Sequence, residues 1–297
     1  MKTIGYYPGC SLCGSASDYD HSLRAVVEKL AIQLQEVPNW VCCGATSAHA
    51  LDHEATLSLA ADNLAKASEA GLREVLAPCA MCYQRLAAAA HELASKPVLR
   101  QRVTKALGRP ENMHLEQVRP LSLLNWLGEL PEEALKACIT RPLAGLKVAC
   151  YYGCLLVRPP KITGESNYEM PQSMERVLRV AGAEPVRWSM ATECCGASLA
   201  LSRTESVVRL TKSICQSARK AGADLICLAC PMCHANLDMR QGFGDAGSPP
   251  IPVVYLTQLL GLAMGCSAER LGFKSHFVPV EPVLTGALGR AKQTASV

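Results

Sequence analysis

The sequence lacks an apolar run long enough to cross a membrane, and it has few aromatic residues and a modest charge. The longest apolar stretch, residues 251–266, is interrupted by Thr257 and Gln258, whereas a membrane span needs about 20 apolar residues. This interrupted stretch instead predicts a strand followed by a buried helix. Aromatic residues make up 5% of the 297 residues, the net charge is +4, and no aromatic residue lies within the basic stretch 96–109. We therefore expect neither a membrane span nor nucleic-acid binding.

The opening residues also lack the features of a signal peptide. MKTIGYYPGC has no positively charged segment followed by an apolar segment and a small-residue cleavage site. This predicts a cytoplasmic protein, and thiols in the cytoplasm are kept reduced. Clusters among the sixteen cysteines are therefore expected to be metal ligands or redox groups, because structural disulfides are rare in that compartment.

Two copies of one cysteine pattern run through the chain. Each copy has a single cysteine after a strand-like segment, then Cys-Cys-Gly, then Cys-x-x-Cys, and the copies are displaced by 144, 152 and 151 positions at these three motifs. Matched motifs in one order predict two homologous domains, 1–143 and 144–297, the second with a polar C-terminal tail. The first set of cysteines is Cys10, Cys42, Cys43, Cys79 and Cys82, and the second is Cys154, Cys194, Cys195, Cys230 and Cys233.

Strands and helices alternate within each copy. Short β-rich segments at 4–7, 74–77, 147–151 and 224–228 lead into the cysteine motifs, and helical patterns cover 20–35, 53–70, 83–93, 174–181 and 206–221. A further helix is expected near 121–138, before a linker at 141–145. This alternation predicts the α/β class, with two homologous Rossmann-like domains that are related by a pseudo-twofold repeat. Each would have a mainly parallel sheet covered by helices, with the cysteines at the carboxyl ends of the strands.

Five cysteines in each copy indicate a soft metal centre. Thiolates select zinc, copper(I) or iron-sulfur clusters, and a structural zinc or a cubane cluster takes four of them. One cysteine per copy is therefore left over. A cluster that is larger or more open than a cubane would use every ligand, and a helix that starts at Cys-x-x-Cys would favour the thiolate form.

The other six cysteines are expected to be mainly structural. We predict small, buried side chains at Cys138, Cys215 and Cys266. For Cys150 and Cys227, which lie in strand segments, core packing is favoured and a supporting or alternative ligand role stays open. Cys13 is expected not to be a ligand, although it forms Cys-x-x-Cys with Cys10.

The doubled motif resembles the CCG-domain signature, and nearly the whole chain resembles the B-type subunit of heterodisulfide reductase and its relatives. The segments that carry the resemblance are YYPGC, the two Cys-Cys-Gly motifs, CYQRL and CPMCHANLD. The resemblance implies that the ten paired cysteines bind two noncubane [4Fe-4S] clusters, which face each other across the domain interface. A disulfide between the clusters would be split by one electron from each side. His234 is implied as a catalytic proton donor or a supporting residue.

The resemblance also implies partner proteins. These are a C-type subunit that carries cubane clusters, further subunits of the complex, and a lipoate-binding protein, with a disulfide or thiol as substrate. The resemblance implies an oxidoreductase of this kind and leaves two settings open, which are reduction of the mixed disulfide of coenzymes M and B in methanogens and sulfur oxidation in bacteria. The Ala- and Arg-rich composition favours bacterial sulfur oxidation. One alternative is an electron-transfer subunit that connects a flavin dehydrogenase of succinate, glycolate, lactate or glycerol 3-phosphate to quinone, with one cluster and one zinc. The other alternative is a purely structural zinc protein.

Overall fold

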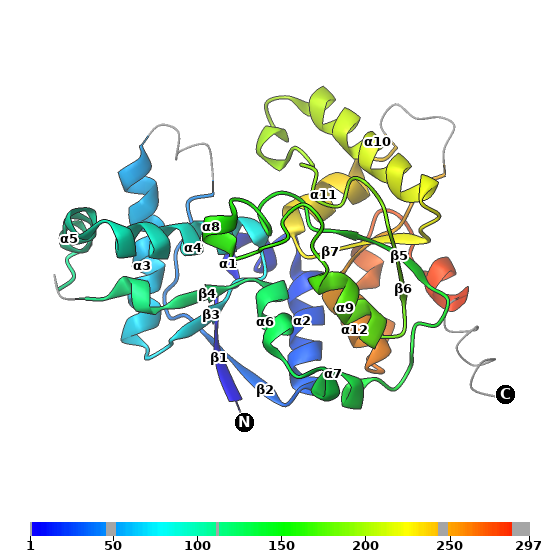
Figure 1. Ribbon diagram of the computed structural model, residues 1–297, viewed down its shortest axis with the longest axis horizontal. Helices are drawn as coiled ribbons and strands as arrows, with labels where there is room; N and C mark the ends of the chain where they lie inside the picture. The colour runs from blue at the N-terminus through cyan, green and yellow to red at the C-terminus, as the bar shows by residue number, and fades with distance from the viewer. Residues whose placement is uncertain (1, 46–51, 111–112, 243–248, 287–297) are drawn as a thin grey trace.

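The computed structural model of the protein describes residues 2–45, 52–110, 113–242 and 249–286 (Figure 1). Over these residues the chain forms two four-stranded parallel sheets covered by helices, which confirms the predicted α/β class. Buried side chains from both sheets belong to one continuous hydrophobic core. No helix in the described ranges is long and apolar enough to cross a membrane.

The first sheet has the strand order β2-β1-β3-β4, and all neighbours are parallel. Its strands are β1 (Lys2–Tyr6), β2 (Ile32–Glu36), β3 (Glu74–Leu76) and β4 (Arg119–Leu121). The helices of this half are α1 (Gly9–Leu12), α2 (Ser17–Lys29), α3 (His53–Glu69), α4 (Ala80–Ser95), α5 (Pro97–Ala106), α6 (Leu123–Glu129) and α7 (Glu132–Cys138), with the short η2 (Leu115–Gln117) before β4.

The second sheet repeats this plan with the order β6-β5-β7-β8. Its strands are β5 (Lys147–Tyr151), β6 (Glu184–Val186), β7 (Leu225–Leu228) and β8 (Val253–Tyr255). The helices are α8 (Pro160–Thr163), α9 (Ser173–Val180), α10 (Thr204–Lys220), α11 (Pro231–Met239), α12 (Leu256–Ala263) and α13 (Ala268–Leu271), with η3 (Ala197–Leu199) and η4 (Phe273–Ser275). The division proposed at residue 143 falls between the two sheets.

Two predicted helices differ from the observed elements. The helix expected over 20–35 ends at Lys29, and β2 follows a turn at Ala31, whose φ is +54°. Hydrogen-bonded pairing of 32–36 with β1 outweighs the local helical pattern there. The helix expected near 121–138 is divided into α6 and α7 because Pro131 cannot continue a helix. Residues 287–297 of the predicted polar tail lie outside the described residues.

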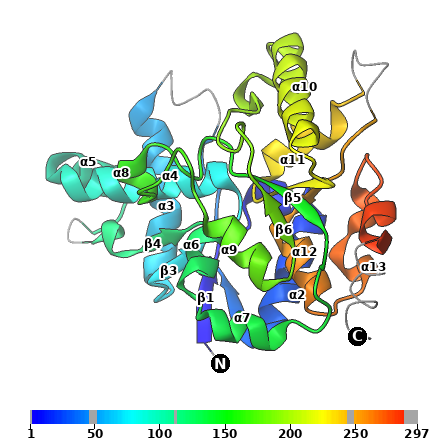
Figure 2. The same ribbon diagram turned by 45° about the vertical axis from the view of Figure 1, so that its right-hand side comes forward.

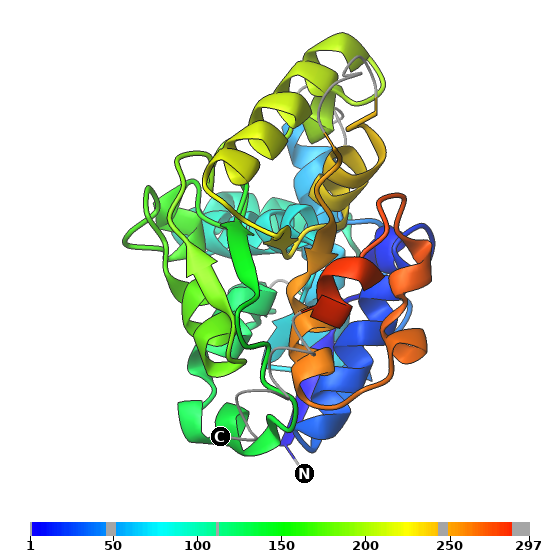
Figure 3. The ribbon, with the colours of Figure 1, turned by 90° about the vertical axis from the view of Figure 1, so that its right-hand side faces the viewer.

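The two halves pack through equivalent helices, in agreement with the predicted pseudo-twofold repeat. Helix α2 of the first half packs on α12 of the second, and α9, the counterpart of α2, packs on α6, the counterpart of α12. Figure 2 shows α6 beside α9, and Figure 3 shows the blue α2 beside the orange α12. Ser22 and Thr257 join α2 to α12 by a hydroxyl contact of 2.7 Å, and Arg176 donates to the Gly128 carbonyl at 3.0 Å.

Candidate metal centres

The structure brings each set of five cysteines to the carboxyl end of its parallel sheet. In the first half, Cys10 follows β1, Cys42 and Cys43 follow β2, and Cys79 precedes the first turn of α4, which carries Cys82. The second half repeats this arrangement after β5, after β6 and at α11, with Cys154, the pair Cys194 and Cys195, and then Cys230 and Cys233. Because neighbouring parallel strands end at one edge, residues far apart in the sequence meet there.

Sulfur atoms within each set lie in contact. Cys43 Sγ is 3.3 Å from Cys82 Sγ in the first set. The equivalent pair in the second set, Cys195 and Cys233, is separated by 3.4 Å. The second set has a further contact of 3.9 Å, in which the Cys154 thiol donates to Cys194. Each set therefore has a compact group of soft donors.

Two tyrosines pack against these sulfurs in the same way. The Tyr7 hydroxyl donates to the carbonyl of Val41 at 2.6 Å, and the Tyr151 hydroxyl donates to the carbonyl of Glu193 at 2.7 Å. Burial raises the pKa of each phenol, and the four nearest thiols of its set raise that pKa further. Each ring therefore stays neutral and fixes the backbone immediately before the Cys-Cys pair.

Each set has an inner and an outer part. The inner cysteines of the two sets are buried, whereas Cys10, Cys42 and Cys194 are exposed and Cys154 is half-buried. The hydrogen bond from Cys154 lowers the pKa of the Cys194 thiol to about 6. The hydrogen bond from Cys82 lowers the pKa of Cys43 to about 7. A thiolate is the form that binds metal, so these two thiols are ready ligands at neutral pH.

Two glycines allow the backbone to approach the sulfurs. Gly9 has φ +65°, and a Cβ atom there would lie 2.9 Å from Cys82 Sγ. Gly153, its counterpart, has φ +64°, and a Cβ atom would lie 3.3 Å from Cys233 Sγ. Both positions combine a left-handed backbone with a close sulfur, so a side chain would displace a candidate ligand.

The two sets meet at the interface between the halves. The Cys79 and Cys230 thiols are buried and lie near enough to shift each other's pKa, which is raised for Cys79 and lowered for Cys230. Beside this pair, Tyr19 of the first half stacks on Tyr255 of the second, with ring centroids 4.1 Å apart. One ligand position from each set therefore faces the other across the pseudo-twofold axis.

The sequence and the fold place the chain among known proteins. The CCG family model, described as a cysteine-rich domain, matches residues 4–87 and 148–238. The chain belongs to this CCG family. The CCG chain is 32% identical over 283 residues to the 8-methylmenaquinol:fumarate reductase membrane anchor subunit of Wolinella succinogenes, covering 94% of this chain and 98% of that one.

A second relative confirms the predicted resemblance to heterodisulfide reductase. It is the B-type subunit of the Ferredoxin/F(420)H(2)-dependent CoB-CoM heterodisulfide reductase of Methanosarcina acetivorans, which is 30% identical over 288 residues, with 94% of each chain covered. Among solved structures, a hypothetical protein from Helicobacter pylori superposes with a TM-score of 0.73 at 14% identity. That match covers 94% of this chain but only 52% of the other, so it concerns the fold of about half of that protein.

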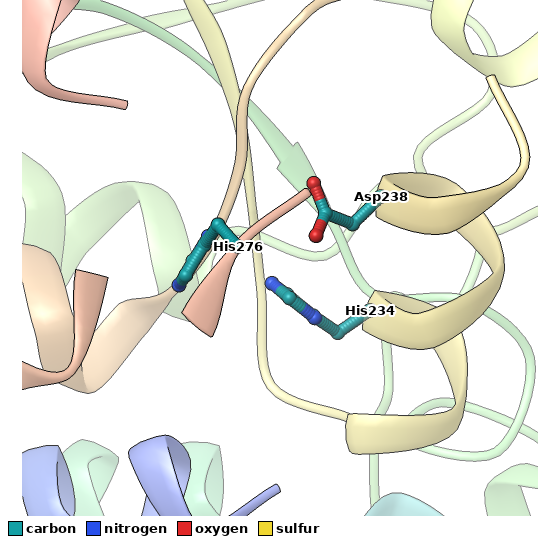
Figure 4. A group of neighbouring side chains, drawn as sticks. All are labelled: His234, Asp238 and His276. Carbon is teal, nitrogen blue, oxygen red and sulfur yellow. The ribbon is translucent and has the colours of Figure 1, made fainter. Parts of the chain in front are cut away.

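His234 of the CCG chain lies on α11, directly after Cys233, and is buried (Figure 4). Its Nε2 is 3.1 Å from the Val253 carbonyl, and its ring stacks on Tyr255 with centroids 4.4 Å apart. Burial, with a smaller effect from His276, lowers the pKa of His234 to about 3. The imidazole is therefore neutral at physiological pH and donates to the carbonyl.

Sequence reasoning missed the partners of His234. Asp238 lies one helical turn after His234 on α11 and accepts hydrogen bonds from the backbone N–H groups of Phe277 and Val278. The Nδ1 atom of His276 lies 2.8 Å from the same Val253 carbonyl that His234 contacts. Figure 4 shows the three polar side chains converging. The spacing of four between His234 and Asp238 was the only sequence signal, because His276 arrives from a distant segment.

The remaining cysteines lie outside the sulfur contacts described above. Cys150 and Cys227 are paired neighbours on β5 and β7 and are fully buried, as core packing requires. Cys215 and Cys266 are also buried, and Cys138 is half-buried. Cys13 is exposed at the end of α1.

Proposed function

We propose that this CCG chain is the iron-sulfur subunit of a heterodisulfide-reductase-like complex, which makes or breaks a disulfide between two metal centres. The observation that carries the proposal is the proximity of the two sets at one interface, where Ala80 and Met81, which follow Cys79, line one cavity with Cys230 and Cys233. A disulfide has two sulfurs and takes two electrons, so two equivalent centres on either side of it match the reaction.

The ten paired cysteines are the proposed ligands of two noncubane [4Fe-4S] clusters. Five cysteines at one edge of each sheet exceed the four that zinc or a cubane cluster takes, and both sets keep the fifth. Each cluster, when bound, would supply or accept one electron. The proposed ligands are Cys10, Cys42, Cys43, Cys79 and Cys82 in the first half, and Cys154, Cys194, Cys195, Cys230 and Cys233 in the second.

The protein around the cysteines would orient the substrate and exclude water. A small cavity beside the second set is lined by Ala80 and Met81 of the first half and by Tyr152, Leu155 and Ala197 of the second, together with cysteines. The cavity has a volume of only about 30 Å³, so these side chains would exclude water from the reacting sulfur. Cys79 and Cys230 precede the first turns of α4 and α11. Hydrogen bonding from neighbouring thiols lowers the pKa of Cys230, which favours its thiolate, whereas Cys230 raises the pKa of Cys79.

His234 remains part of the proposal as a catalytic or supporting residue. Its hydrogen bond to Val253 and its stacking on Tyr255 suit the supporting role better than the role of proton donor. A neutral ring held between α11 and β8 would keep the helix that carries Cys230 and Cys233 in register with the sheet.

The biological setting belongs to the same proposal. We place the complex in the cytoplasm and in bacterial sulfur oxidation, with a C-type subunit that carries cubane clusters and with a lipoate-binding protein. The name of the Methanosarcina acetivorans relative supports the disulfide as substrate class. Thiols are kept reduced in the cytoplasm, and the proposed function needs reduced cysteines, which supports a cytoplasmic location.

A second candidate function has one specific observation in its favour. The Wolinella succinogenes relative, 32% identical, is a subunit of an 8-methylmenaquinol:fumarate reductase. In this alternative the chain passes electrons between quinol and a flavin dehydrogenase, and one of its halves holds zinc. Both candidate functions use the same cysteines, so an experiment must distinguish them by the electron acceptor that each one uses.

The experiment is reoxidation of the protein after purification and reduction without oxygen. Oxidised lipoamide and menadione are added separately, and the visible absorbance of the clusters is followed. The disulfide proposal expects rapid reoxidation by lipoamide in the protein and in Cys215→Ser, and loss of this reaction in Cys230→Ser. Reoxidation by menadione alone contradicts the disulfide proposal and favours electron transfer.

A further inference from the structure

The second half contains a loop that the first half lacks. Eighteen residues separate Cys154 from α9, whereas six separate Cys10 from α2, the counterpart of α9. The longer loop contains α8, and it is one side of the interface between the halves, because the Tyr83 hydroxyl of α4 donates to the Thr163 carbonyl at 3.2 Å. The two sets of cysteines are alike, so this loop serves something that is specific to the second half.

The end of this loop forms one wall of a cavity on the second half. The cavity has a volume of about 290 Å³ and lies between α9 and the end of β6. Its volume is near the lower limit of pockets that bind small organic molecules, about 300 Å³. The lining residues that matter to the argument are Pro171 from the loop, Glu175 and Arg179 from α9, and Val186, Arg187 and Trp188 from the β6 end.

The carboxylates of this cavity have direct hydrogen-bond or ion-pair partners, whereas its two arginines form no direct ion pair among the described residues. Glu169 at the rim lies 3.2 Å from Arg158. Glu175 on α9 is buried and accepts a hydrogen bond from the Tyr152 hydroxyl. Among the described residues, neither Arg179 nor Arg187 lies within ion-pair distance of a carboxylate. Arg187 therefore lines the cavity without an ion-pair partner, and Arg179 interacts only at longer range with the buried Glu175.

The rest of the lining is apolar and flat. The Trp188 indole is fixed because its Nε1 donates to the Cys150 carbonyl at 2.9 Å. Pro171 and Val186 add apolar surface, and burial of this surface against a hydrocarbon ring is favourable. We propose that this cavity binds a small organic carboxylate with a flat apolar body, whose charged group is held by Arg179 and Arg187 and whose body packs on Trp188.

The site is directly connected to the second set of cysteines. Tyr152 lines the cavity that contains Cys154 and Cys194, and its hydroxyl donates to Glu175, which lines the carboxylate site. A ligand that contacts Glu175 is thus one side chain away from the candidate metal centre. In the first half, Pro8 stands at the position of Tyr152, so this connection exists only in the second half.

The test is a calorimetric titration of the whole protein, purified without oxygen, with benzoate and with benzamide. The two probes share a shape and differ in charge. We expect saturable binding of benzoate at millimolar concentration or below, and benzamide roughly tenfold weaker because it lacks the charge-assisted hydrogen bonds. Arg187→Gln and Arg179→Gln should each weaken benzoate roughly tenfold, while Arg209→Gln, an exposed change on α10, should leave binding unchanged.

Three results would overturn the proposal. They are equal binding of benzoate and benzamide, equal binding by Arg187→Gln and Arg209→Gln, and no saturable heat with benzoate. The titration does not depend on the metal content, because none of the ten paired cysteines lines this cavity. A failure here is therefore distinguishable from a failure of the proposed function, which is measured by reoxidation.

Discussion

Replacement of Gly9 by alanine tests whether the first set of sulfurs is held by the backbone that surrounds it. A Cβ atom at Gly9 would lie 2.9 Å from Cys82 Sγ and 3.2 Å from a Tyr7 ring carbon. Cys82 is itself only 3.3 Å from Cys43, so its sulfur cannot move without disturbing that pair. The variant therefore has a specific expected defect, which is loss of metal from the first half.

The magnitude is obtained by comparison with Gly71→Ala. Gly71 also has a positive φ, +74°, but nothing lies within 4 Å of a Cβ atom there. Both variants lose about 1 kcal/mol because an L-residue is strained in this conformation. Gly9→Ala has an additional overpacking cost of about 1–3 kcal/mol. With a Tm change of roughly 2–4 °C per kcal/mol for a chain of this size, Gly9→Ala should melt several degrees below Gly71→Ala.

The assay is iron per chain and Tm, measured for both variants after purification without oxygen. Gly9→Ala should lose about half of the bound iron, because only one of two equivalent sets is affected. Gly153→Ala, with a longer Cβ to sulfur distance of 3.3 Å, should show a milder form of the same defect in the second half. The reasoning is refuted if Gly9→Ala keeps as much iron as Gly71→Ala and has the same Tm.

Three individual side chains give further predictions. Cys230→Ser should lose metal from the second half, whereas Cys215→Ser, buried in α10, should keep it; equal iron in both would contradict the ligand assignment. Tyr151→Phe removes the part-buried hydrogen bond to the Glu193 carbonyl and should lower the free energy of unfolding by about 1 kcal/mol, measured by denaturant titration; an unchanged midpoint would argue against this contact. Burial raises the pKa of Glu175, so the stability of the native state falls as pH rises above the value at which an unfolded glutamate ionises. Glu175→Gln should therefore flatten the dependence of Tm on pH between about 5 and 8. A slope identical to that of the parent protein would contradict this prediction.

Much of the candidate site could be predicted because the repeat determines where the cysteines lie. A cysteine that follows a parallel strand must lie at the carboxyl edge of the sheet, so Cys10 and Cys154 could be placed without knowledge of the packing. The same argument predicted that a helix starts at each Cys-x-x-Cys motif. Local sequence was sufficient at these positions because the end of a strand-forming segment and the start of a helical pattern are both marked by neighbouring residues.

The remaining features depend on contacts between segments that are distant in sequence. The strand β2 was predicted as helix because its residues continue an apparently helical pattern, and only pairing with β1 makes them extended. His276 reaches Val253 from the C-terminal segment, and its spacing from other motifs contains no periodic signal. The proximity of Cys79 to Cys230 arises from docking of the two halves, which single-sequence patterns do not encode.

The loop before α9 illustrates the same limit. Its extra residues could be counted from the interval between Cys154 and Cys194, which is longer than that between Cys10 and Cys42. The count could not indicate that the end of this loop would form a cavity against Trp188. Length shows that an insertion is present, whereas its conformation depends on the surface on which it packs.

The most direct test of the central claim is a measurement of iron, acid-labile sulfide and zinc per chain in protein purified without oxygen. Two noncubane clusters held by the ten paired cysteines predict about eight irons, a matching amount of sulfide and no zinc. About four irons with one zinc would contradict two equivalent centres, and with them a disulfide reaction that proceeds from both sides of the interface.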